Sequence, residues 1–201
     1  LGLRTLTVIH DAETAVQKHH PEFSIQKLDY DDPETYKMLG QGDTEGVFQL
    51  ESSGMKQVLV GLQPQNLEDI IALISLYRPG PMDSIPTYLR NRHEPDKISY
   101  KTPQLAHILD VTNGCIVYQE QVMQIFRELA GFSFGQADNV RRAMSKKKHA
   151  VMEAEREHFV HGCTDPGNEC PGCVANGISE KVANEIYDEM SSFASYAFNK
   201  S

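Results

Sequence analysis

The sequence predicts a mainly α-helical protein with at most short strand pieces. Three observations support this fold class. Apolar residues recur at three- and four-residue intervals through most segments, which is the spacing of one helix face. Capping residues, prolines and glycines stand at the ends of these segments, where helices begin and end. The best strand-like run, Gly46-Val47-Phe48-Gln49-Leu50, is short.

The composition is that of a folded protein of one or two domains. The chain has 201 residues, 40% hydrophobic and 23% charged, with a formal net charge of −9. This length can bury a core, and the composition argues against general disorder. No apolar run approaches the ~20 residues that span a bilayer. No signal peptide is recognisable, so we expect a cytoplasmic protein. Because the chain starts without Met inside an apolar run, we expect a piece of a longer protein.

The predicted helices of the N-terminal half begin at good capping residues. Asp32 precedes Pro33, Ser52 or Ser53 precedes the third helix, and Asn66 precedes the fourth. The fourth helix is apolar on most sides, so we expect it to be central to the core. The helices predicted in this half span residues 3–20, 33–39, 54–62, 67–77 and 84–91.

The C-terminal half shows the same alternation of helices and turn signals. Asn113-Gly114 predicts a turn, and Gly131 stands where a helix should end. Ser179 is a good cap for the last helix. A loop is predicted over 164–172. The helices predicted in this half span residues 103–109, 119–129, 137–145, 148–160 and 180–196.

Five cations are concentrated in the run from Arg141 to Lys148. Arg141, Arg142, Lys146, Lys147 and Lys148 are five of the 19 Lys and Arg residues of this acidic chain. Arg presents a fork of donors that matches phosphate, and Lys acts as a point charge. A concentrated cationic site in an acidic protein favours a specific anionic ligand. The alternative is a solvated helix end that carries lysines.

Two further polar groups are candidates for binding. Arg78 lies in the stiff turn Tyr77-Arg78-Pro79-Gly80-Pro81, which would present it with little loss of entropy. Gln119 and Gln121 open an apolar helix, and Gln can bind a base edge. The alternatives are a simple helix stop for the first and a polar helix start for the second.

Three cysteines have a spacing typical of metal ligands. Cys163, Cys170 and Cys173 lie in a loop rich in Pro and Gly, and Cys-Pro-Gly-Cys lets two thiolates reach one ion. The sequence therefore predicts a structural zinc site, with a surface loop of free thiols as the alternative. The candidates for the fourth ligand are His161, His158 and, less favoured, Cys115.

Several blocks of sequence resemble one known family. GDTEGVFQLESSGMKQVL, DIIALISLYRPGPMD, YQEQVMQI, ADNVRRAMSKKK and FASYAFNKS occur in this order. Together they resemble the alpha subunit of bacterial DNA polymerase III, the C-family replicative DNA polymerase. The resemblance covers nearly the whole chain, although the loop CTDPGNECPGC is longer and richer in Cys than the family leads us to expect.

The resemblance implies a helical fingers domain of a DNA-directed DNA polymerase. Residues 1–30 would be the end of the palm or a connecting helix, and residues 31–201 the fingers, with a Cys-rich loop within 153–178. The parent protein would carry out template-directed deoxynucleotidyl transfer in DNA replication. The alternative function is a non-catalytic, zinc-containing module that binds nucleic acid or another protein.

The resemblance also implies roles for particular residues. In the family, palm aspartates hold two Mg²⁺ ions. We expect these aspartates upstream of this segment, which leaves it without catalytic residues and inactive alone. The dNTP triphosphate would be bound by Arg141 and Arg142, with Arg78, Gln119 and Gln121 nearby. DNA primer–template would contact the lysines, and other replisome subunits would bind elsewhere in the parent; no membrane contact is expected. The expected DNA-binding lysines are Lys146, Lys147, Lys148 and Lys200.

Overall fold

The computed structural model describes residues 4–146, 149–194 and 199–200. Within these ranges the chain is helical and contains no strand. One isolated antiparallel bridge joins Cys163 and Cys170. The predicted mainly α fold is therefore confirmed. None of the described helices is both long and apolar enough to cross a membrane.

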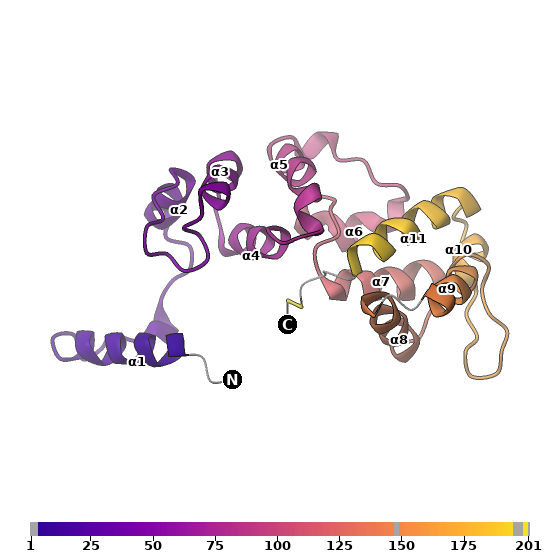
Figure 1. The fold of residues 1–201 in the computed structure, drawn as a ribbon, viewed down its shortest axis with the longest axis horizontal. Helices are drawn as coiled ribbons and strands as arrows, with labels where there is room; N and C mark the ends of the chain where they lie inside the picture. Colours follow the sequence, from indigo (N-terminus) through magenta and orange to yellow (C-terminus); the bar gives the residue numbers. More distant parts are fainter. Residues whose placement is uncertain (1–3, 147–148, 195–198, 201) are drawn as a thin grey trace.

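The first helix, α1 (Arg4–Gln17), lies apart from the other helices (Figure 1). The segment that follows folds back on its end through the short 3₁₀ turn η1 (Ile25–Lys27). There the Ile25 N–H donates to Glu13 Oε1 at 3.0 Å, and Gln17 Nε2 donates to the Phe23 carbonyl at 2.9 Å. The apolar side chains of Leu6 and Val8 remain 57% and 65% exposed.

The next three helices, α2 (Pro33–Gly40), α3 (Ser53–Leu62) and α4 (Leu67–Leu76), begin where the sequence predicts. The Asp32 carboxylate accepts from the N–H groups of the first turn of α2. Ser52 Oγ accepts from Met55 N–H at 3.2 Å, and Asn66 Oδ1 accepts from Asp69 N–H at 2.9 Å. These side chains satisfy N–H groups that have no partner within the helix.

The strand predicted over residues 46–50 is wrong, because this segment is a series of turns. Gly46 and Gln49 have φ angles of 78° and 66°, in the left-handed region. The Thr44 hydroxyl donates to the Leu50 carbonyl at 2.6 Å and closes the loop. Phe48 points outward and is 71% exposed. A short apolar run forms a strand only when another strand offers hydrogen bonds, and none lies beside it in the described chain.

The middle of the chain is built from short helical pieces around α5 (Ile85–His93). The turn predicted at Asn113-Gly114 is confirmed, since both residues have left-handed φ angles of 51° and 79°. A loop therefore turns back toward the helix that begins at Gln119. The short pieces are η2 (Pro81–Ser84), η3 (Pro95–Lys97), η4 (Pro103–Leu105), α6 (Ala106–Leu109) and η5 (Asp110–Thr112).

Over its described residues, the C-terminal half is a bundle of five helices whose longest members pack against one another. The start of α8 lies three residues earlier than predicted. Ser133 and Gln136 form a reciprocal capping box there, with bonds of 2.7 and 3.3 Å. The helices are α7 (Gln119–Ala130), α8 (Phe134–Ser145), α9 (His149–His161), α10 (Gly172–Ala175) and α11 (Glu180–Ala194).

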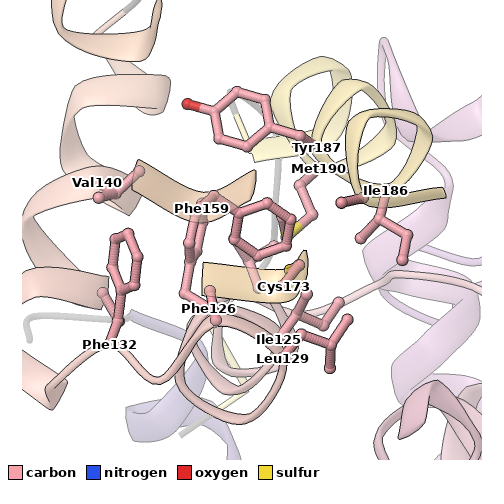
Figure 2. Packing of buried hydrophobic residues seen from close by; sticks show 14 of the residues in the cluster. Ile125, Phe126, Leu129, Phe132, Val140, Phe159, Cys173, Ile186, Tyr187 and Met190 are labelled. Atoms are coloured by element: carbon pink, nitrogen blue, oxygen red, sulfur yellow. The ribbon is translucent and has the colours of Figure 1, made fainter. Parts of the chain in front are cut away.

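In the described part of the chain the buried apolar side chains form two clusters, one mainly from residues 36–88 and the other from residues 105–193. The C-terminal cluster centres on Phe126 of α7, which is fully buried. Its ring centroid lies 5.3 Å from Phe132, 5.1 Å from Phe159 and 6.0 Å from Tyr187. Figure 2 shows these rings packed together. This cluster fixes α7 against α9 and α11 and so sets the position of α8 beside them.

The Cys-rich loop is a hairpin whose two ends lie in close backbone contact at Gly162 and Gly172. Gly162 and Gly172 have φ angles of 92° and 78°, and a Cβ on Gly172 would lie 2.3 Å from the Gly162 nitrogen. Only glycine permits this close approach of two backbones. Above it, Cys163 and Cys170 exchange two N–H···O bonds of 2.9 Å. The loop then projects beyond α9 and α10 (Figure 1).

Candidate functional site

The two adjacent arginines of α8 share one carboxylate. Arg141 donates to Asp138 Oδ1 from Nε at 3.0 Å and from Nη2 at 2.8 Å. Arg142 Nη2 lies 2.5 Å from Asp138 Oδ2. The hydrogen bond from Arg141, followed by smaller contributions from both guanidinium charges, holds the pKa of Asp138 below its usual value. One negative charge thus orients two positive charges on consecutive residues.

The two arginines differ in how much of each side chain solvent reaches. The Arg141 side chain is 19% exposed, and its Nη1 also donates to Gln119 Oε1 of α7 at 2.8 Å. The Arg142 side chain is 63% exposed. Arg141 therefore joins α8 to α7, whereas Arg142 holds most of its side chain in solvent.

A cavity of about 540 Å³ is lined by Arg141, whereas Arg142 is not among its lining residues. Its volume is within the range of small-molecule sites. One wall comes from α7 and the other from the start of α8. The side chains that line it mix apolar, cationic and anionic groups, among them Gln119, Met123, Arg127, Phe134, Asp138 and Arg141.

The two glutamines predicted to bind nucleotide lie in different environments. Gln119 lines the cavity. Gln121 is only 4% exposed, and its Oε1 accepts from the N–H groups of Val117 and Tyr118 at 2.8 and 2.9 Å. Its Nε2 donates to the Ile108 carbonyl and to the Thr112 hydroxyl. All of these bonds hold the turn before α7, so Gln121 serves the fold rather than the cavity.

Arg78 lies in the turn that ends α4 and is half-buried. Its N–H donates to the Leu76 carbonyl at 2.7 Å, and its carbonyl accepts from Met82 N–H at 3.1 Å. This residue does not line the cavity beside α8. The structure therefore does not bring Arg78 together with the arginine pair in one pocket.

The lysines predicted to contact DNA are also placed differently from one another. Lys146 is exposed at the C-terminal end of α8. Lys147 and Lys148 lie outside the described residues. Lys200 Nζ lies 2.5 Å from Glu68 Oε2 and 5.1 Å from the centroid of the Tyr118 ring. Lys200 therefore forms an intramolecular ion pair with Glu68, which joins residues 199–200 to α4.

The described residues contain no group of three or more His, Cys, Asp or Glu that could hold a metal ion. Cys173 is fully buried, and burial raises the pKa of its thiol to about 12. Burial also raises the pKa of Cys170, while Cys163 is partly exposed. His161 is 41% exposed and lies 3.8 Å from Glu180. The geometry gives no support to the zinc hypothesis, which stays a prediction.

The residues of the cavity that sequence reasoning did not single out include Arg127, Phe134 and Asp138. A signal was present for two of them. Asp138 stands three and four residues before the arginine pair, the spacing at which charges meet on a helix. Ser133 and Gln136 match a capping box, which would have put Phe134 at the first position of the helix. Nothing local in the sequence places Arg127 beside them.

Comparison with known proteins relates the chain to one family. Residues 5–167 match the family model described as the bacterial DNA polymerase III alpha subunit finger domain. The chain is 48% identical over 199 residues to the DNA polymerase III subunit alpha of Staphylococcus aureus strain COL. It is 46% identical over 199 residues to the protein of the same name from Staphylococcus epidermidis strain ATCC 12228. Each alignment covers 98% of this chain and 18% of the relative.

Proposed function

The chain belongs to the family of bacterial DNA polymerase III alpha subunit finger domains, and on this premise we propose that it binds the incoming dNTP and the DNA for a DNA-directed DNA polymerase. The chain spans 18% of the length of the curated relatives that it matches. The activity of the whole protein, deoxynucleotidyl transfer in DNA replication, is therefore part of the proposal. So are its primer–template, its replisome partners and its place in the cytoplasm.

One observation carries the proposal for the nucleotide. Arg142 holds its guanidinium in solvent, 63% exposed, yet fixed in direction by Asp138. An oriented but accessible arginine loses little entropy when it binds phosphate. We therefore assign the main contact with the triphosphate to Arg142.

Arg141 has a different part in the proposal. Because its guanidinium already bonds to Asp138 and Gln119, it reaches a phosphate only if it gives up one of these bonds. Its contribution is thus mainly to fix α8 against α7, so that Arg142 stands in the correct place. Lys146, exposed at the end of the same helix, would add charge on the side of the DNA backbone.

The metal ions of the reaction would be held elsewhere in the parent protein. Mg²⁺ in polymerases is bound by carboxylates together with substrate phosphates. We therefore assign no step of the metal chemistry to this segment. We place the boundary between the palm or connecting helix and the fingers near residue 30. The separation of α1 from the other helices supports this boundary (Figure 1), whereas the match to the finger-domain family already begins at residue 5, within α1.

The test compares arginine variants of the full-length polymerase in primer extension. Loss of a charge-assisted bond to phosphate costs ~1.5–3 kcal/mol, which is roughly 10- to 150-fold in kcat/KM for the nucleotide. We expect Arg142→Ala to show a loss of this size. Arg90→Ala is the matched control, because Arg90 is an exposed helical arginine that does not line this cavity. Unchanged nucleotide kinetics in Arg142→Ala would refute the assignment.

A further inference from the structure

The cavity between α7 and α8 has an exposed aromatic wall that the triphosphate does not explain. Phe134 is the first residue of α8, and its side chain is 64% exposed. Met123 contributes a second apolar surface to the same cavity. The exposure of the apolar Phe134 ring to water is unfavourable in free energy. A flat, apolar ligand that displaced this water would recover that cost.

An arginine stands directly beside this ring. The Arg127 guanidinium carbon lies 5.9 Å from the centroid of the Phe134 ring. Proteins that bind single-stranded nucleic acid combine these two groups, because the ring stacks on a base and the arginine meets the phosphate. Phe134 and Arg127 are not part of the buried apolar cluster, and neither takes part in the ion pairs of Asp138.

The charges around the cavity favour a base over a phosphate chain inside it. The carboxylates of Glu120, Glu128 and Asp138 line it, against the guanidiniums of Arg127 and Arg141. A phosphate placed within this set would meet more negative than positive side chains. A neutral base would not be repelled, and its N–H edge could donate to a carboxylate. The phosphate would instead remain at the rim, where the arginines reach it.

We propose that this cavity receives an unpaired base of the DNA template, stacked on Phe134, with Arg127 on the adjoining phosphate. The inference rests on the proposed function in DNA synthesis. The base of an incoming nucleotide must pair with the template, so a pocket that isolates one base suits a base that is still unpaired. The same chemistry would hold the base of a free dNTP, and the test separates these two sources.

The experiment measures binding of DNA to the full-length polymerase with Phe134 replaced. The probe is a primer–template whose 5′ template overhang carries 2-aminopurine, compared with a blunt duplex of the same sequence. Stacking of one base predicts that Phe134→Ala weakens binding of the overhang roughly 5- to 150-fold. Binding of the blunt duplex should not change, and Phe134→Trp should retain affinity for the overhang.

Two further variants control this measurement. Phe48→Ala removes another highly exposed phenylalanine, 71% exposed, in a loop far from α8 in sequence, and should leave binding unchanged. Arg127→Ala should weaken binding and lower the slope of log affinity against log salt by about 1. Equal affinity of wild type and Phe134→Ala for the overhang, or an equal loss in Phe48→Ala, would overturn the inference.

The outcomes also distinguish this inference from the function on which it rests. If Phe134→Ala raises KM for dNTP but leaves overhang binding unchanged, the base comes from the nucleotide and the template assignment is wrong. If Phe134→Ala changes neither overhang binding nor the KM for dNTP while Arg142→Ala loses activity, the contact of Arg142 with the triphosphate is supported and the stacking site at Phe134 is refuted. A polymerase unaffected by Arg142→Ala contradicts the proposed function itself.

Discussion

The guanidinium of Arg92 on α5 binds both carboxylate oxygens of Asp69 on α4, with two N···O distances of 3.1 Å. Asp69 is only 4% exposed. It also accepts from Gln65 N–H at 2.9 Å, and its own N–H is capped by Asn66. A buried carboxylate with this many donors holds two helices in one orientation. This ion pair therefore joins α4 to α5 in the N-terminal half of the chain.

Replacement of Arg92 by Ala should therefore destabilise the fold strongly. The carboxylate of Asp69 would stay buried without its counter-ion, at a cost of ~3–5 kcal/mol in the free energy of unfolding. Chemical denaturation measures this change. Lys97→Ala is the control, since Lys97 pairs with Glu94 at the surface and such pairs contribute ~1 kcal/mol or less. Equal losses in both variants would contradict the role given to Asp69.

Truncation of Phe126 should also be costly, because three aromatic rings surround it and solvent does not reach it. We expect Phe126→Ala to lower the free energy of unfolding by ~3–5 kcal/mol through lost burial and the cavity left behind. Val111→Ala, at a side chain 64% exposed, should change it by no more than ~0.5 kcal/mol. Thermal unfolding followed by circular dichroism compares the two.

The ion pairs of Asp138 should make stability depend on pH in the acid range. Because the arginines lower the pKa of Asp138 in the folded state, their stabilising effect is complete above the usual value of 3.8. It is lost as the pH falls through the lowered pKa. The difference in unfolding free energy between wild type and Asp138→Asn should thus be constant from about pH 5 to 7 and shrink below 3.8. A difference that grows on acidification would contradict this.

The same substitution should strengthen anion binding, because the competition of the Asp138 charge with phosphate outweighs the orientation that Asp138 gives to Arg142. Asp138 competes with any phosphate for both Arg141 and Arg142. A charge at ~4 Å in water is worth about 1 kcal/mol, so Asp138→Asn should tighten dNTP binding by roughly fivefold. Titration of the full-length polymerase with dNTP at constant salt measures this. A weaker affinity would show that the carboxylate positions the arginines more than it competes for them.

The cysteines should differ widely in reactivity. Thiolates react and thiols do not, so a raised pKa and burial both protect a cysteine. Burial raises the pKa of Cys115 to about 11 and that of Cys173 to about 12. Cys163, partly exposed in the hairpin, should react first with a maleimide at neutral pH. Mass spectrometry should find Cys115 and Cys173 modified only after unfolding; their labelling in the folded protein would contradict this burial.

Local features of the sequence determined where the helices begin. The caps at Asp32, Ser52 and Asn66 act over three or four residues, so the sequence alone was enough to place them. The basic run from Arg141 onward was likewise visible without coordinates. The blocks of sequence shared with the polymerase family were equally plain, and the family assignment is confirmed.

Only the tertiary structure decided which of the candidate side chains meet. The buried Gln121 side chain forms its hydrogen bonds within the Ile108–Tyr118 turn. Lys200 pairs with Glu68, which is distant from it in sequence. Arg127 and Phe134 come together because the core around Phe126 packs α7 against its neighbours. The run at 46–50 forms turns because strand pairing needs a distant partner. Helix-capping hydrogen bonds form between residues that are close in sequence, so the sequence predicts them. The burial of a side chain, an ion pair between distant residues and the pairing of strands depend on how the whole chain folds.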